Sequence, residues 1–177
     1  MLLMDRGCIC SNNRLMKDHF IYKRDRLWGT YRFYSNGSNL GGLRFSVWSS
    51  KAVGSINGKH YTFHTRGIFR RVTEVMDFHG QVLARIQYDL WGTKARIHAA
   101  DETYQWKHFG LWRSKWGISG SRRPGIQARG GHIQLRGEGD SNWEWMVLAG
   151  FYIAHFYSQM DVVILIPVIV VIIASTQ

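Results

Sequence analysis

The chain has 177 residues, the size of one domain with its own hydrophobic core. Its formal net charge of +11 indicates either an anionic partner, such as nucleic acid, anionic lipid or an acidic protein, or a surface charge that balances the apolar C-terminal tail and keeps the chain in solution. The 12 acidic residues leave few pairs for acid–base catalysis, and no Walker loop, G-x-G-x-x-G or H-E-x-x-H pattern occurs, so we expect neither an enzyme nor a cofactor. Cys8 and Cys10 are too close for an ordinary structural disulfide, which fits a reducing, cytoplasmic compartment.

The first half of the body reads as short strands separated by turns. Abundant aromatic residues, frequent Gly and alternation of polar with apolar side chains are typical of β-structure. Asn57-Gly58 is a two-residue hairpin signal, because both positions tolerate a positive φ. In chain order we predict strands over 20–22, 29–34, 43–48, 61–64 and 70–77, with a turn over 35–42.

The second half continues this pattern. Phe78-His79-Gly80 is predicted to be another hairpin turn, and 119–129 is predicted to be a basic loop. Regularly spaced short strands with turn signals between them indicate a sandwich or a closed barrel. The strands predicted here cover 81–88, 93–99, 104–108, 115–118 and 132–136.

Residues 143–158 break the β-pattern, because they are apolar on every face of a helix. Asn142 can cap this helix, and Glu144 lies in its first turn. The helix would be roughly 22–24 Å long, which is shorter than the ~30 Å hydrocarbon core of a bilayer. We therefore predict a buried core helix. The core side chains expected on it are Leu148, Phe151, Tyr152 and Phe156.

The predicted organisation has three parts: an N-terminal extension over 1–16, expected to be disordered, a domain over 17–159, and an apolar appendage over 160–177. The appendage contains 162–174 (VVILIPVIVVIIA), which is rich in β-branched residues and has Pro167 near its middle. We predict that it is not an independent transmembrane helix. It is expected to pack on the domain in an extended or helical form, or to complete an oligomer contact. The alternative is a C-terminal membrane anchor.

Three segments carry a family resemblance: 75–84 (VMDFHGQVLA), 104–106 (YQW) and 143–157 (WEWMVLAGFYIAHFY). With the aromatic-rich strands that precede the apolar helix, they resemble the tubby C-terminal-like superfamily, which includes the tubby domain, phospholipid scramblases and LURP-one-related proteins. The similarity covers residues 20–158. It implies a mainly β fold, a closed antiparallel barrel of about twelve strands threaded by the hydrophobic C-terminal helix, in which closure removes strand edges.

Basic residues in predicted loops and at the starts of predicted strands are the best candidates for a binding site. Glycines with free N–H groups beside arginines can form a cradle for phosphate, as over 117–131. The alternative is a set of solvated loops whose charges face water separately. The candidate anion- or lipid-binding residues are Arg70, Arg71, Arg113, Lys115, Arg122 and Arg123.

The function expected from these features is non-enzymatic binding to an anionic membrane surface or to phospholipid headgroups. Tubby-like proteins are associated with phosphoinositides and membranes, so the resemblance supports this expectation. A second hypothesis is nucleic-acid binding, in which aromatic side chains stack on bases beside phosphate contacts. It would use Trp106, Trp112 and Trp116 with Lys107, Arg113 and Lys115.

A third hypothesis is a structural or scaffold protein anchored to a membrane by its C-terminus. We expect no metal site, since His60 and His64 have no carboxylate or cysteine near them in sequence. A small-molecule substrate is not expected, and the sequence does not determine the oligomeric state.

Overall fold

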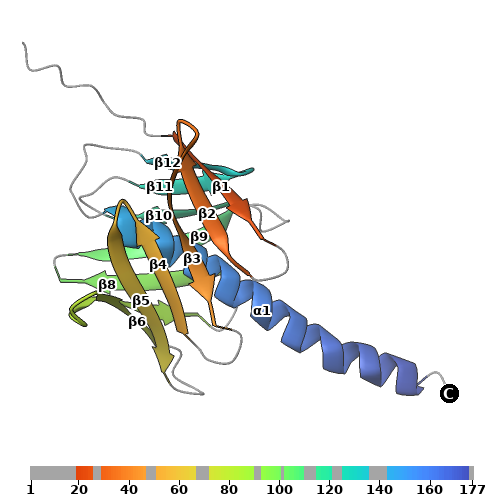
Figure 1. Cartoon of the computed structure of the whole chain (residues 1–177). Helices are drawn as coiled ribbons and strands as arrows, with labels where there is room; N and C mark the ends of the chain where they lie inside the picture. The colour runs from red at the N-terminus through yellow and green to blue at the C-terminus, as the bar shows by residue number, and fades with distance from the viewer. Residues whose placement is uncertain are drawn as a thin grey trace, which may run out of the picture.

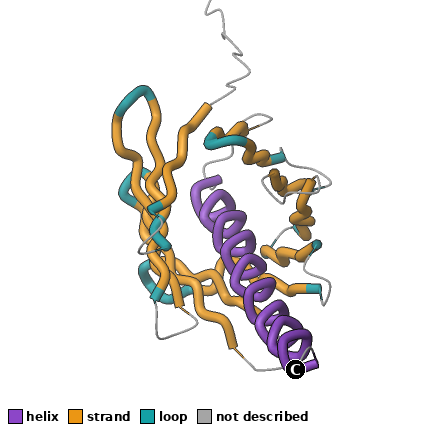
Figure 2. Tube along the Cα trace, turned by 90° about the vertical axis from the view of Figure 1, so that its right-hand side faces the viewer, coloured by secondary structure: helices purple, strands orange, loops and turns teal. Residues whose placement is uncertain are grey.

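The computed structural model describes residues 19–25, 29–46, 51–66, 72–89, 93–100, 102–109, 115–120, 125–135 and 143–175. The side chains of His19 and of the helix beyond Gln159 are not among those described. The predicted 1–16 extension also lies outside this part of the chain. The fold is a closed antiparallel barrel with one C-terminal helix inside it (Figures 1 and 2), which confirms the predicted fold class.

Twelve strands follow one another around the barrel, and β1 closes it by pairing with β12 through Phe20 and Ile133. Closure leaves no free strand edge. The strands are β1 (His19–Arg24), β2 (Tyr31–Ser35), β3 (Ser38–Phe45), β4 (Lys51–Ile56), β5 (Lys59–Arg66), β6 (Val72–Asp77), β7 (Val82–Tyr88), β8 (Lys94–Ala99), β9 (Thr103–Phe109), β10 (Lys115–Ser119), β11 (Ile126–Arg129) and β12 (His132–Leu135).

Two of these strands were not predicted from the sequence, and β3 begins earlier than predicted. β4 was not predicted, although the Asn57-Gly58 hairpin that follows it is present with both residues at positive φ. β11 lies within the predicted basic loop 119–129. β3 begins inside the predicted 35–42 turn, because Gly41 and Gly42 are strand residues and not turn residues. Without side chains they allow the backbones of the neighbouring strands to come close: a Cβ on Gly42 would be 2.6 Å from the carbonyl oxygen of Tyr31.

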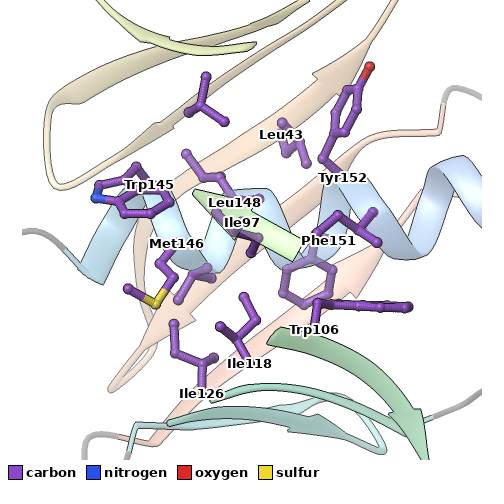
Figure 3. Packing of buried hydrophobic residues seen from close by; sticks show 14 of the residues in the cluster. Leu43, Ile97, Trp106, Ile118, Ile126, Trp145, Met146, Leu148, Phe151 and Tyr152 are labelled. Carbon is purple, nitrogen blue, oxygen red and sulfur yellow. The ribbon is translucent and has the colours of Figure 1, made fainter. Parts of the chain in front are cut away.

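The first part of the helix α1 (Trp143–Ser175) lies inside the barrel (Figure 2). Its buried side chains between Trp145 and Tyr157 lie on all of its faces. Of the predicted core residues, Leu148, Phe151 and Tyr152 are buried, and Phe156 is partly buried against the ring of Tyr88. Figure 3 shows Leu148, Phe151 and Tyr152 among inward-pointing side chains of the surrounding strands. The lumen is too wide to be filled by the strand side chains alone. Side chains of the helix and of the strands therefore pack together into a single hydrophobic core.

A polar cluster fixes α1 against one wall of the barrel. The Tyr152 hydroxyl is 2.8 Å from the Thr65 hydroxyl, which in turn contacts Thr73, and Thr73 contacts the hydroxyl of Tyr88 at 2.7 Å. One helical turn further on, the Tyr157 hydroxyl donates to the backbone carbonyl of Lys94. Because these hydroxyls are satisfied inside an apolar lumen, they specify the height and rotation of the helix.

The helix does not end at Ser158 as predicted, and its backbone stays helical to Ser175. Ser158 donates a hydrogen bond to the carbonyl of His155, and no Gly or Pro interrupts the helix at this point, so the polar residues after it cause no break. The C-terminal part of α1 continues away from the barrel (Figure 1). Of the two forms expected for the appendage, extended or helical, the structure therefore has the helical one. Over the described side chains, no helix is both long and apolar enough to cross a membrane.

Replacement of Gly150 by Ala tests the fit of the helix in the barrel. A Cβ on Gly150 would overlap the indole ring of Trp116. Helix propensity alone would stabilise this variant by about 1 kcal/mol, but the overlap is expected to produce net destabilisation of about 1–3 kcal/mol. Urea unfolding measures the effect. In a Trp116→Leu background the same substitution should lose its cost, and an equal cost in both backgrounds would contradict this contact.

Acidification tests the burial of His155. Burial, and secondarily the nearby Arg24 guanidinium, lower the pKa of His155 to about 4. The unfolded chain takes up this proton near pH 6.5. It therefore binds more protons than the folded chain between pH 6.5 and about 4, and the free energy of unfolding should fall as the pH falls through this window.

The matched variant is His155→Phe, which keeps an aromatic ring against Phe45 but cannot be protonated. The difference in unfolding free energy between the two proteins should shift in favour of the variant as the pH is lowered. Parallel pH profiles for the two proteins would show that His155 is not buried as neutral imidazole.

Candidate functional site

The outer surface of the barrel carries cations that are not neutralised by neighbouring acids. Within the twelve described strands the acidic residues are Glu74 and Asp77, both in β6. Glu74 pairs with Arg66 at 3.2 Å and with Arg85 at 3.6 Å. The acidic side chains of the sheet are therefore confined to β6. Lys or Arg occurs on all of the remaining strands except β12.

Three pairs of cations lie directly opposite each other on neighbouring strands. Like charges in this position are destabilising, since their Cβ atoms are only about 4.5–5.5 Å apart. None of the six residues has an ion pair with another residue in the described part of the chain, and none of the five strands from β8 to β12 contains an acid. The pairs are Lys23 with Arg32, Lys94 with Lys107, and Lys115 with Arg129.

A groove of about 1090 Å³ runs over the outside of β2, β3 and β4. Its floor has small side chains, because Gly42 and Ser55 occupy outward positions there. Hydroxyl groups of Thr30 and Ser46 and the carboxylate of Asp25 lie at its edges. The basic residues that line it are Arg32, Arg44, Lys51 and His60, all exposed.

The groove can therefore accept a phosphate or carboxylate from more than one side. An arginine fork binds such anions through two parallel hydrogen bonds, and a lysine adds a movable charge. Val53 is 56% exposed on the groove floor, so an apolar part of a ligand also finds a surface there.

Of the six predicted binding residues, the structure describes Lys115. It lies at the start of β10, half-buried, with Phe109 opposite it on one side and Arg129 on the other. The neighbouring His132 continues the same row on β12. The other five predicted residues, Arg70, Arg71, Arg113, Arg122 and Arg123, lie outside the described residues.

The outward cations of the strands, such as Lys23, Arg32, Lys94 and Lys107, were not predicted as binding residues. Each is a single basic residue at an alternate position, which is ordinary for a half-buried strand. Only the register between strands brings two of them together, so no local sequence signal identifies the pairs.

Of the three aromatic side chains assigned to base stacking, the two that the structure describes do not support that role. Trp106 is fully buried and Trp116 is 3% exposed, because both point into the barrel. Trp112 lies outside the described residues. Buried indoles cannot offer a face to a base, so Lys107 and Lys115 are not accompanied by the predicted stacking platforms.

No group of three or more His, Cys, Asp or Glu that could hold a metal ion is found within the described residues. No family model, curated protein or solved structure matches the chain. The resemblance to the tubby C-terminal-like superfamily therefore stays a prediction, based on the segments that carry it.

Reversal of one charge tests whether the opposed cations cost stability. Lys107→Glu places a carboxylate opposite Lys94, so the variant is expected to be more stable than the natural chain by about 0.5–1 kcal/mol at low salt. Urea unfolding at low and high ionic strength measures this. Arg44→Glu on β3 is the control, because it changes the net charge by the same amount at an exposed position opposite Val53. An equal gain for both variants would show that general repulsion, and not the opposed pair, is responsible.

Proposed function

We propose that the protein is a non-enzymatic binding protein that engages anionic membrane surfaces or phospholipid headgroups through the basic outside of its barrel. The observation that carries the proposal is the set of three opposed cation pairs without acidic partners in the described structure. A fold that keeps like charges together loses a little stability, and a bound anion between them would remove the repulsion.

The groove over β2–β4 supports the headgroup part of the proposal. Arg32, Arg44 and Lys51 surround a space with room for a phosphorylated headgroup. The resemblance to the tubby C-terminal-like superfamily points in the same direction, because its members are associated with phosphoinositides and membranes. A reducing compartment, as favoured by Cys8 and Cys10, would place the protein at the cytoplasmic leaflet, which is the anionic one.

Vesicle flotation tests this function. The full chain should float with vesicles of phosphatidylcholine containing phosphatidylserine, and binding should weaken as the salt concentration rises. Each cation near the surface contributes about 1 kcal/mol, so Lys107→Gln and Lys115→Gln should each lower the affinity about fivefold.

Arg85→Gln is the matched control, because this arginine already pairs with Glu74 and should contribute less. Equal binding to vesicles with and without phosphatidylserine would contradict the proposal. Salt-sensitive retention on single-stranded DNA or RNA that exceeds vesicle binding would favour the nucleic-acid alternative.

A further inference from the structure

The two ends of the barrel differ in charge. Odd-numbered strands finish, and even-numbered strands begin, at the end from which α1 leaves, which we name the helix-exit end. At the opposite end the charged terminal residues of the described strands are Lys59 and Asp77. At the helix-exit end half of the strands terminate in a cation and none in an acid, although the described residues next to the strand ends include two acids, Asp25 and Asp89. These cations, named the basic rim, are Arg24, Lys51, Arg66, Lys94, Lys115 and Arg129.

The basic rim extends around the whole circumference. Its residues belong to β1, β4, β5, β8, β10 and β11, and the closed strand order separates them around the barrel. No side of the barrel presents all of them together. A flat surface can face all six only if it lies across the helix-exit end, perpendicular to the barrel axis. Arg66 is already paired with Glu74, and the remaining five have no ion pair with another described residue.

The helix α1 passes through the centre of this rim. His155 stacks on Phe45, the last residue of β3, and Tyr157 contacts Lys94, the first residue of β8. The rings of Phe45 and Tyr88 close the barrel around the helix at this level. Beyond it the backbone continues as a helix to Ser175, away from the barrel (Figure 1). The sequence of this continuation is apolar over 162–174.

The connections between strands repeat the difference between the ends at the level of sequence. Apart from the Gly130-Gly131 turn, the connections at the helix-exit end are described only in part, and their segments 26–28, 47–50, 67–71, 90–92 and 110–114 lie outside the described residues. Each contains an aliphatic residue followed by Trp or Phe: Leu27-Trp28, Val47-Trp48, Ile68-Phe69, Leu90-Trp91 and Leu111-Trp112. The connections at the opposite end contain no Trp; one of them contains Phe78, which is 73% exposed, and another contains Arg122-Arg123. Trp beside Lys and Arg is the composition of chains at the membrane–water interface.

We propose that the barrel docks end-on on an anionic phospholipid bilayer, with the basic rim at the headgroups and the continuation of α1 inserted in the hydrocarbon. This orientation rests on the proposed function, and it identifies the helix-exit end as the part of the barrel that contacts the membrane. Rim cations meet headgroup phosphates in one plane, while the apolar helix leaves water. As a helix 162–174 is about 20 Å long, less than the ~30 Å hydrocarbon core, so it enters the bilayer without crossing it.

Two labels on one strand test the orientation. Ser46, which follows the last residue of β3, is exposed at the helix-exit end, and Ser38, the first residue of β3, is exposed at the opposite end. Each is replaced by Cys in a full-length chain carrying Cys8→Ser and Cys10→Ser, and is labelled with a polarity-sensitive fluorophore. With phosphatidylserine vesicles, the label at 46 should shift to shorter wavelength and the label at 38 should not.

The outcomes separate the orientation from the proposed function. Flotation with an equal shift at both positions, or with a shift at 38 alone, overturns end-on docking while membrane binding stands. Loss of flotation itself overturns the proposed function. A concentration-dependent shift at 46 without vesicles would show that a second copy of the chain, and not lipid, covers this end.

Insertion of the helix has its own test. Ile169→Asp should weaken vesicle affinity about 100-fold, because a carboxylate near the hydrocarbon centre is strongly unfavourable. Ser38→Asp changes the net charge equally at the opposite end and should leave the affinity nearly unchanged. Equal effects of the two variants would overturn insertion of the helix.

Discussion

An apolar helix with no polar face must be covered on every side, and this requirement determines the rest of the structure. A single sheet covers one side of a helix, whereas a closed barrel covers its whole circumference. The close fit depends on small residues where the surfaces meet: Gly54 faces the methyl groups of Leu148, and Gly150 faces the indole of Trp116. The barrel depends on the helix in turn, since without it the aromatic rings of the lumen would have no common core.

Because the core lies entirely inside the barrel, the outer positions of the strands contribute little to packing. Side chains alternate along each strand, so the inward set can be selected for stability and the outward set for charge. Opposed cations cost a few tenths of a kcal/mol to about 1 kcal/mol per pair, a small amount beside the apolar burial of one aromatic side chain. The fold can therefore carry a strongly basic surface without losing its integrity.

The helix, the hairpins and a β-architecture that is either a sandwich or a barrel follow from local patterns, whereas the closed barrel was expected from the family resemblance. Apolar character on all faces identifies the core helix, and Asn57-Gly58 identifies a turn that the structure contains. β4 is missed because Ala52 and Gly54 are small where the helix approaches, so their strand signal is weak. β11 is missed because it is short and lies among glycines and arginines.

These two omissions explain why the charge pattern could not be predicted. Neighbouring strands run in opposite directions. When β4 is left out, the strands from β5 to β10 are therefore assigned the wrong direction, and their first residues are placed at the wrong end of the barrel. Leaving out β11 as well gives β12 its correct direction again. With β4 and β11 absent, Lys94 and Lys115 would appear at the end opposite to Arg24 and Lys51. The pairs of cations also require the register between strands, which no single segment of sequence contains.

The order of elements along the chain has a consequence for biosynthesis. The strand that closes the barrel and the helix that fills it are made after the other eleven strands, so those strands cannot reach their final arrangement until β12 and α1 have been synthesised. The pairing of β1 with β12 joins distant parts of the sequence, which slows folding. During synthesis the inward-facing aromatic side chains of the strands stay without their partner helix. The nascent chain should therefore depend on chaperones until α1 is released.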